Sequence, residues 1–273
     1  MENLNNESVQ KNTNSGLSNI FATIAVVLCI VFGFVVWNFV LGNPSNFVDN
    51  DPSKDPVSGN LLGMMYKGGY VIGVLIGLLT MTVVFGIERW IVISKASGSG
   101  NIKAFVAEVQ SLIRVGKVNE AIELCDTQKG SVANVVKAAL IKYDTVKKSG
   151  ESSEEAMAAI QKEIEEATVL EMPMLEKNMV VLATLVSIGT LTGLLGTVTG
   201  MIKAFSALST SGAPDSSALA TGISEALMCT ATGIGTSTLA IVLYNIFTTK
   251  IDKLTHFIDE VGFAITQSYK ASR

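Results

Sequence analysis

Four long apolar stretches, each without a charged residue, constrain this fold more than any other feature. They cover residues 20–41, 68–87, 178–202 and 226–247. A helix needs about 20 apolar residues to cross the hydrocarbon core of a membrane, and within that core a helix satisfies its own backbone hydrogen bonds. Charged residues are only 16% of the chain, against about 25% in soluble domains. The sequence therefore predicts an all-α integral membrane protein with four transmembrane helices.

The first stretch is expected to stay as a membrane span. Its apolar run exceeds the core of a typical secretion signal, and no small-residue cleavage site follows it. Most basic residues lie between Lys95 and Lys177 or in the tail from Lys250 to Arg273. Because basic residues are retained on the cytoplasmic side, both segments and both termini are predicted to be cytoplasmic.

The sizeable soluble segment lies between the second and third stretches. Residues 102–125 have helical apolar spacing interrupted at Gly116, and residues 131–148 continue as a further helix. Beyond the last stretch, apolar residues recur at heptad-like steps, at Ile251, Leu254, Ile258, Val261 and Ile265. These positions either pack within their own subunit or contribute to contacts between subunits. Either way, a cytoplasmic helical bundle is predicted.

A long helix is expected to enter the third stretch from the soluble side. Ser152 and Glu155 have the spacing of a capping box, which marks a helix start. The helix is predicted to continue without a strong break to about Phe205. Pro173 should bend it, because proline removes a backbone donor and crowds the preceding turn.

Small residues recur at every fourth position where helices must approach closely. In the second stretch they are Gly69, Gly73 and Gly77, and in the third they form two pairs, Gly189 with Gly193 and Gly196 with Gly200. Such spacing lets helix backbones touch in a membrane. It indicates tight helix packing and carries no function by itself.

Polar residues lie along the last two stretches, and one of these residues is acidic. Glu225 is a lone carboxyl at the edge of the fourth stretch, and such groups commonly mark ion pathways. One face of the third stretch holds Thr190, Gly193, Thr197, Gly200 and Ala204. The fourth stretch has two adjoining faces of this kind. One holds Thr221, Glu225, Cys229, Thr232 and Thr236. The other holds Ala226, Thr230, Gly233, Ser237 and Ala240. A threonine can also bond back to its own helix, so the whole stripe predicts a pathway better than any single hydroxyl.

Two segments together resemble a known family. GLLGTVTGMIKAF (residues 193–205), followed by GISEALMCTATGIGTSTLAIVLYNIF (residues 222–247), is similar to the signature of the ExbB/TolQ/MotA proton-channel family, and closest to ExbB. The Glu88-Arg89 pair after the second stretch and the long soluble insert fit the same resemblance. Members commonly have three spans, so the first span here is a departure.

The resemblance implies a bacterial inner-membrane motor. Five subunits would form a ring around two copies of a single-span, ExbD-like partner, whose aspartate carries protons, and the output would reach a TonB-like protein. By motif, Thr197 and Thr230 take the places of pore threonines and Glu225 that of the pore glutamate. Thr190, Thr232 and Thr236 are further candidates for the lining. Glu225 would be a second proton acceptor, a contact that keeps the pore wet, or a protonated group bonded to a neighbouring helix.

The predicted organisation follows from the spans and the resemblance. It comprises a polar N-terminal segment (1–19), an extra transmembrane helix (20–41), a periplasmic loop (42–67), a transmembrane helix (68–92), a cytoplasmic helical domain (93–177), a pore-lining helix (178–206), a short periplasmic loop (207–219), a second pore-lining helix (220–248) and a cytoplasmic helical tail (249–273).

Other functions are excluded or left open by the same residues. No nucleotide-binding loop, hydrolase motif or metal-ligand cluster occurs, so we expect neither an enzyme nor a cofactor, with protons as the coupling ion. Basic residues are dispersed, so no nucleic-acid partner is expected, whereas membrane lipid is. TolQ-like, flagellar-stator-like and gliding motors stay open, as does a nonconducting scaffold or permease subunit.

Overall fold

The computed structural model describes residues 23–149, 152–210 and 216–271, and the chain in these ranges is helical apart from turns and one isolated bridge between Phe47 and Pro56. The predicted segment 1–19 lies outside the described residues. Four helical segments are long and apolar enough to cross a membrane: Thr23–Leu41, Tyr70–Ala96, Ser153–Ser206 and Leu219–Ala271. The predicted all-α fold, with two helical segments that far exceed a single span, is confirmed.

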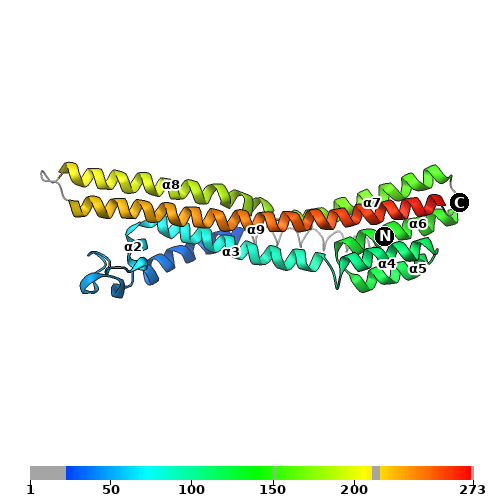
Figure 1. Ribbon diagram of the computed structural model, residues 1–273, viewed down its shortest axis with the longest axis horizontal. Coiled ribbons are helices and arrows are strands. Elements are labelled where there is room, and N and C mark those ends of the chain that lie inside the picture. Colours follow the sequence, from blue (N-terminus) through cyan, green and yellow to red (C-terminus); the bar gives the residue numbers. More distant parts are fainter. Residues whose placement is uncertain (1–22, 150–151, 211–215, 272–273) are drawn as a thin grey trace, which may run out of the picture. The chain divides into compact units, whose positions relative to one another are not determined.

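The described chain forms two compact units. The first unit contains the residues up to Gly86 and Val181–Leu243, and the second contains Ile87–Val180 and the residues from Tyr244 onward. The elements in chain order are η1 (Val36–Leu41, π-helical), η2 (Pro44–Asn46), η3 (Val48–Asn50), α2 (Leu61–Lys67), α3 (Tyr70–Ala96), α4 (Ile102–Arg114), α5 (Val118–Gln128), α6 (Ser131–Ser149), α7 (Ser153–Glu176), α8 (Met179–Thr210) and α9 (Ser216–Ala271) (Figure 1).

In the first unit, the N-terminal helix (Thr23–Leu41) packs closely on α3 through glycines. A Cβ at Gly73 would lie 3.0 Å from Phe34 Cδ1, and one at Gly77 would lie 3.0 Å from Ile30 Cα. Gly33 faces the same two α3 glycines. This N-terminal helix is therefore fixed to α3 by backbone contact, with little room for any side chain between them.

The loop between the N-terminal helix and α3 is held by polar contacts. Trp37 Nε1 donates a hydrogen bond to the Tyr66 carbonyl oxygen at 3.2 Å, and the two rings stack at 5.1 Å between centroids. Asn46 is buried, and its Nδ2 donates to the carbonyls of Val40 and Leu41 at 3.0 and 2.9 Å. These bonds satisfy carbonyls at the end of η1 that lack a partner in their own helix.

In the second unit, α4, α5, α6 and α7 pack with the C-terminal part of α9 (Figure 1). Gly116 separates α4 from α5 with a φ of +79°, a conformation that favours glycine, as the sequence predicts. The predicted capping box at the start of α7 is also present, since Ser152 Oγ accepts from Glu155 N at 3.3 Å and Ser152 N donates to Glu155 Oε2 at 3.4 Å.

The heptad-like positions of α9 are core positions of this unit. All five are buried within the single chain: Ile251, Leu254, Ile258, Val261 and Ile265. Further along, the Tyr269 ring meets the Tyr143 ring edge to face at 5.2 Å. Of the two interpretations left open by the sequence, packing inside the subunit accounts for these residues.

The predicted unbroken helix from residue 152 to about 205 is wrong in one respect, because a two-residue turn divides it into α7 and α8. The helix continues past Pro173 to Glu176. Lys177 then turns to an extended ψ of 138°, and Asn178 adopts a φ of +61°. Asparagine tolerates this left-handed conformation better than most residues. The strong break therefore lies beyond the proline and not at it.

Candidate functional site

In the first unit, α8 and the part of α9 up to Leu243 pack side by side as antiparallel helices through small residues (Figure 1). A Cβ at Gly193 would lie 3.1 Å from Gly233 Cα, and a Cβ at Gly200 would lie 3.0 Å from the Cβ of Ala226. Contacts this tight leave no space for a larger side chain. The backbones of α8 and α9 therefore touch over several turns.

The other predicted packing glycines meet different neighbours. A Cβ at Gly189 would lie 2.7 Å from Ser237 Oγ on α9. A Cβ at Gly196 would lie 2.8 Å from Cys229 Sγ and 3.1 Å from Val71 Cγ1, so this residue lets α8 approach both α9 and α3. Gly69 is not in a helix contact but in the turn before α3, with a φ of +72°.

Hydroxyl groups meet in pairs along this glycine contact. Thr190 Oγ1 donates to Ser237 Oγ at 2.9 Å. Seven residues further along α8, the hydroxyls of Thr197 and Thr230 are in direct contact. Both also reach the Gly193 carbonyl oxygen, at 3.3 and 3.4 Å. Three of the predicted lining residues are thus brought to one line between α8 and α9.

The remaining predicted threonines bond within their own helix. Thr232 Oγ1 donates to the Met228 carbonyl at 2.8 Å, and Thr236 Oγ1 donates to the Thr232 carbonyl at 2.9 Å. The Thr236 side chain is also buried in the single chain. Such back-bonds satisfy a hydroxyl locally. These two residues are not part of the line of paired hydroxyls.

Glu225 has a partner that the sequence interpretation missed. Lys203 Nζ lies 3.9 Å from Glu225 Oε2, and the side chains are 59% and 15% exposed respectively. Lys203 is the sole charged residue of α8 and stands inside the first family-like motif. That isolation was the available signal, because a lone charge on an otherwise apolar helix generally needs a partner.

The hydroxyl line is accessible from outside the helix pair. Thr190 is exposed and Thr197 is half-buried. Thr197 also lines a shallow apolar depression on α8, formed with Leu194, Val198, Met201, Ile202 and Phe205. A hydroxyl both donates and accepts hydrogen bonds, so a group that reached this line from outside could be bonded in a charged or a neutral state.

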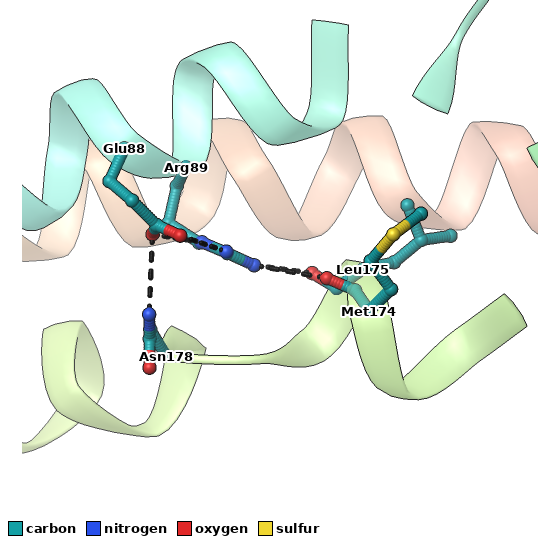
Figure 2. Close-up of polar contacts among 5 residues, drawn as sticks. All are labelled: Glu88, Arg89, Met174, Leu175 and Asn178. Atoms are coloured by element: carbon teal, nitrogen blue, oxygen red, sulfur yellow. Dashed lines mark hydrogen bonds and ion pairs between the residues drawn. The ribbon is translucent and has the colours of Figure 1, made fainter. Parts of the chain in front are cut away.

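A second polar cluster closes the turn between α7 and α8, within the second unit (Figure 2). Arg89, on α3, is fully buried. Its Nε donates to Glu88 Oε2 at 2.6 Å, and its Nη1 donates to the carbonyls of Met174 and Leu175 at 3.2 and 3.3 Å. Asn178 Nδ2 completes the cluster by donating to Glu88 Oε2 at 3.3 Å. Arg89 therefore satisfies carbonyls at the end of α7, where helical partners are lacking.

Comparison with known proteins places these elements in a family. The family model of the MotA/TolQ/ExbB proton channel family matches residues 128–260, which include both hydroxyl pairs and the Lys203–Glu225 pair. The TolQ protein of the Tol-Pal system of Haemophilus influenzae is 36% identical over 94 residues, 33% of this chain and 41% of that protein.

Two ExbB-named relatives give a similar result. The biopolymer transport protein ExbB of Salmonella typhimurium is 39% identical over 81 residues, 30% of this chain and 33% of that protein. An ExbB-like biopolymer transport protein of Synechocystis is 34% identical over 86 residues, 31% of this chain and 41% of that protein. The matches thus span a third to about two fifths of the relatives' length, and the relatives carry both names. The chain is a multi-pass membrane protein of the MotA/TolQ/ExbB proton channel family, by the match over residues 128–260 and by its four helical segments long and apolar enough to cross a membrane.

Proposed function

We propose that this chain is a subunit of a bacterial inner-membrane, proton-driven motor that powers TonB-dependent transport at the outer membrane. In this proposal five copies form a ring, and two copies of a single-span, ExbD-like protein occupy its centre. A TonB-like protein receives the output, and both termini of this chain lie in the cytoplasm. Support comes from the family membership and from relatives named as biopolymer transport proteins.

The observation that carries the proposal is the polar line along the α8–α9 contact. It begins at the Thr190–Ser237 pair, continues through Thr197 and Thr230, and approaches Lys203. Thirteen residues separate Thr190 from Lys203, which is about 20 Å along a helix. A line of this length covers most of a membrane core of about 30 Å.

The chemistry of this line suits a proton carried by a partner's carboxyl group. A hydroxyl can donate to a carboxylate and accept from a carboxylic acid, so Thr197 and Thr230 can bond the carboxyl group in both states. One proton crossing the membrane contributes about 2.3 kcal/mol per 100 mV. Several protons in sequence therefore supply enough free energy for mechanical work.

Proton flux in liposomes tests the proposal directly. The chain would be purified with its single-span partner, and flux measured under an imposed potential. Thr197→Ala and Thr230→Ala should each reduce flux, and Glu225→Ala should reduce it at least as strongly, with native mass spectrometry showing intact assemblies. Thr80→Ala is the matched control, because Thr80 lies on α3 and donates to the Ile76 carbonyl of its own helix at 2.8 Å. Wild-type flux from all three pore variants would refute the assignment.

A TolQ-like motor is the second candidate, favoured by the match to the Haemophilus influenzae protein. The two candidates share the polar line and differ in the partner that receives the work. Co-purification separates them, because an ExbD-like and TonB-like pair would support the first and a Tol-system partner the second. An ATPase partner would instead support a permease, the alternative that the family match disfavours.

A further inference from the structure

Two opposite charges meet on α8 and on the part of α9 before Lys250, which carry no other charged residue. Lys203 is the only charged residue of α8, residues 179–210, and Glu225 is the only one in residues 216–249 of α9. Their charged atoms lie 3.9 Å apart, at one end of the line of paired hydroxyls. Charged side chains within membrane helices are costly and generally pair with one another. Pairing of the two lone charges is therefore a specific feature of this helix pair.

The surroundings of Glu225 leave it dependent on this partner. Its side chain is 15% exposed, so water solvates it poorly, and the residue one turn along, Cys229, is buried. The ammonium group of Lys67 also acts on Glu225, but more weakly than that of Lys203, and its Nζ donates to the Ser53 carbonyl oxygen at 3.0 Å. A carboxylate of low exposure requires a counter-charge or several donors.

A turn without side chains leaves room for the ammonium group. Gly68 and Gly69 connect α2 to α3, and Cys229 Sγ lies 3.5 Å from the Gly68 carbonyl oxygen. A Cβ at Gly69 would lie 3.6 Å from Lys203 Nζ. The turn therefore passes beside Cys229, one helical turn from Glu225, and beside Lys203, and its backbone limits where the Lys203 ammonium group can lie.

We propose that Lys203 is a positioning residue of the ion route, whose ammonium group holds the Glu225 carboxyl at the end of the hydroxyl line. The proposal rests on the proposed function for what the route conducts. In this role, both the positive charge of Lys203 and the length of its side chain matter. A second cation of similar reach should replace it, whereas an uncharged side chain of similar length should not.

A double-mutant cycle on proton flux tests the pairing. The chain would be purified with its partner as wild type, Lys203→Met, Glu225→Gln and the double variant. Lys203→Met should lower flux about tenfold, the effect of about 1.4 kcal/mol. It should have little further effect in the Glu225→Gln background, and Lys203→Arg should retain most of the flux. Equal effects of Lys203→Met in both backgrounds, or an arginine variant no better than the methionine variant, would overturn the proposal.

The melting temperatures of the same proteins distinguish the possible failures. If the wild type conducts no protons, the proposed function fails. The pair is then judged by whether the two substitutions are non-additive in melting temperature, and additivity overturns it. If the wild type conducts and the substitutions couple in melting temperature but not in flux, the pair is a packing contact alone and Lys203 has no role in the route.

Discussion

Replacing Arg89 should destabilise the second unit more than any other single change at the α7–α8 turn. The side chain is fully buried, and it donates to both oxygens of Glu88 and to the carbonyls of Met174 and Leu175 (Figure 2). Arg89→Met would keep an apolar side chain of similar length but remove the guanidinium that donates to the Glu88 carboxylate and to the Met174 and Leu175 carbonyls. Breaking a buried ion pair by removing one member costs about 3–5 kcal/mol.

The exposure of the remaining carboxylate decides where in this range the loss should fall. The Glu88 side chain is 25% exposed and keeps the Asn178 hydrogen bond, so part of its charge can be solvated after the change. We therefore expect a loss of about 3 kcal/mol, or roughly 10 °C in melting temperature for a unit of this size. Arg89→Lys should lose about half as much, because an ammonium keeps the charge but cannot bond Glu88 and both carbonyls in one plane.

Thermal unfolding of the detergent-solubilised protein in a Trp37→Phe background measures this loss, with Trp90 fluorescence as the probe, since Trp37 and Trp90 are the two tryptophans of the chain. Trp90 belongs to the same unit and packs against Phe247 at 6.5 Å between ring centroids. Lys95→Met is the matched control, since Lys95 is an exposed basic residue near the end of the same helix, and should change stability by less than about 0.5 kcal/mol. If Arg89→Met melted no lower than Lys95→Met, the buried cluster would contribute nothing and the reasoning would fail.

Three further changes test separate parts of the structure. Gly233→Val should disrupt the α8–α9 contact, because its Cβ would lie 2.8 Å from Gly193 Cα. Gly235→Val should be tolerated, since a Cβ at Gly235 meets no atom within 4 Å. Size-exclusion chromatography of the two variants would show the difference. Burial raises the pKa of the Cys125 thiol from 9.0 to about 12, so near pH 8 its maleimide labelling should be about 10³-fold slower in the folded than in the unfolded chain by peptide mass spectrometry. Ser152→Ala should cost about 1 kcal/mol and speed hydrogen exchange in the first turn of α7 only.

Much of the fold could be predicted because it depends on local patterns. Runs of apolar residues long enough for a membrane locate the spans, and the Ser152 capping box and Gly116 mark helix ends through chemistry within a few residues. The break at Asn178 was missed because the proline nearby is the stronger local signal. That break is accompanied by contacts from Arg89 and Glu88, which are distant in sequence.

The candidate site could be predicted only as separate stripes on two helices. Helical spacing places Thr190 and Thr197 on one face of α8, and Thr230 and Ser237 on one face of α9. It does not say which residue of one helix lies opposite which residue of the other. For the same reason Lys203 was missed, since its nearness to Glu225 depends on the pairing of the helices and not on either sequence segment alone.

The glycine contacts allow one register between α8 and α9, and this register accounts for both hydroxyl pairs. Because the helices are antiparallel and Gly193 lies against Gly233, residues that follow Gly193 on α8 lie opposite residues that precede Gly233 on α9. Thr197 then faces Thr230, and a step of seven residues, close to two helical turns, brings Thr190 opposite Ser237. A shift of one residue would rotate each helix by about 100° and separate both pairs. The small residues therefore do more than allow close packing, because the register that they permit is the one that aligns the hydroxyl groups.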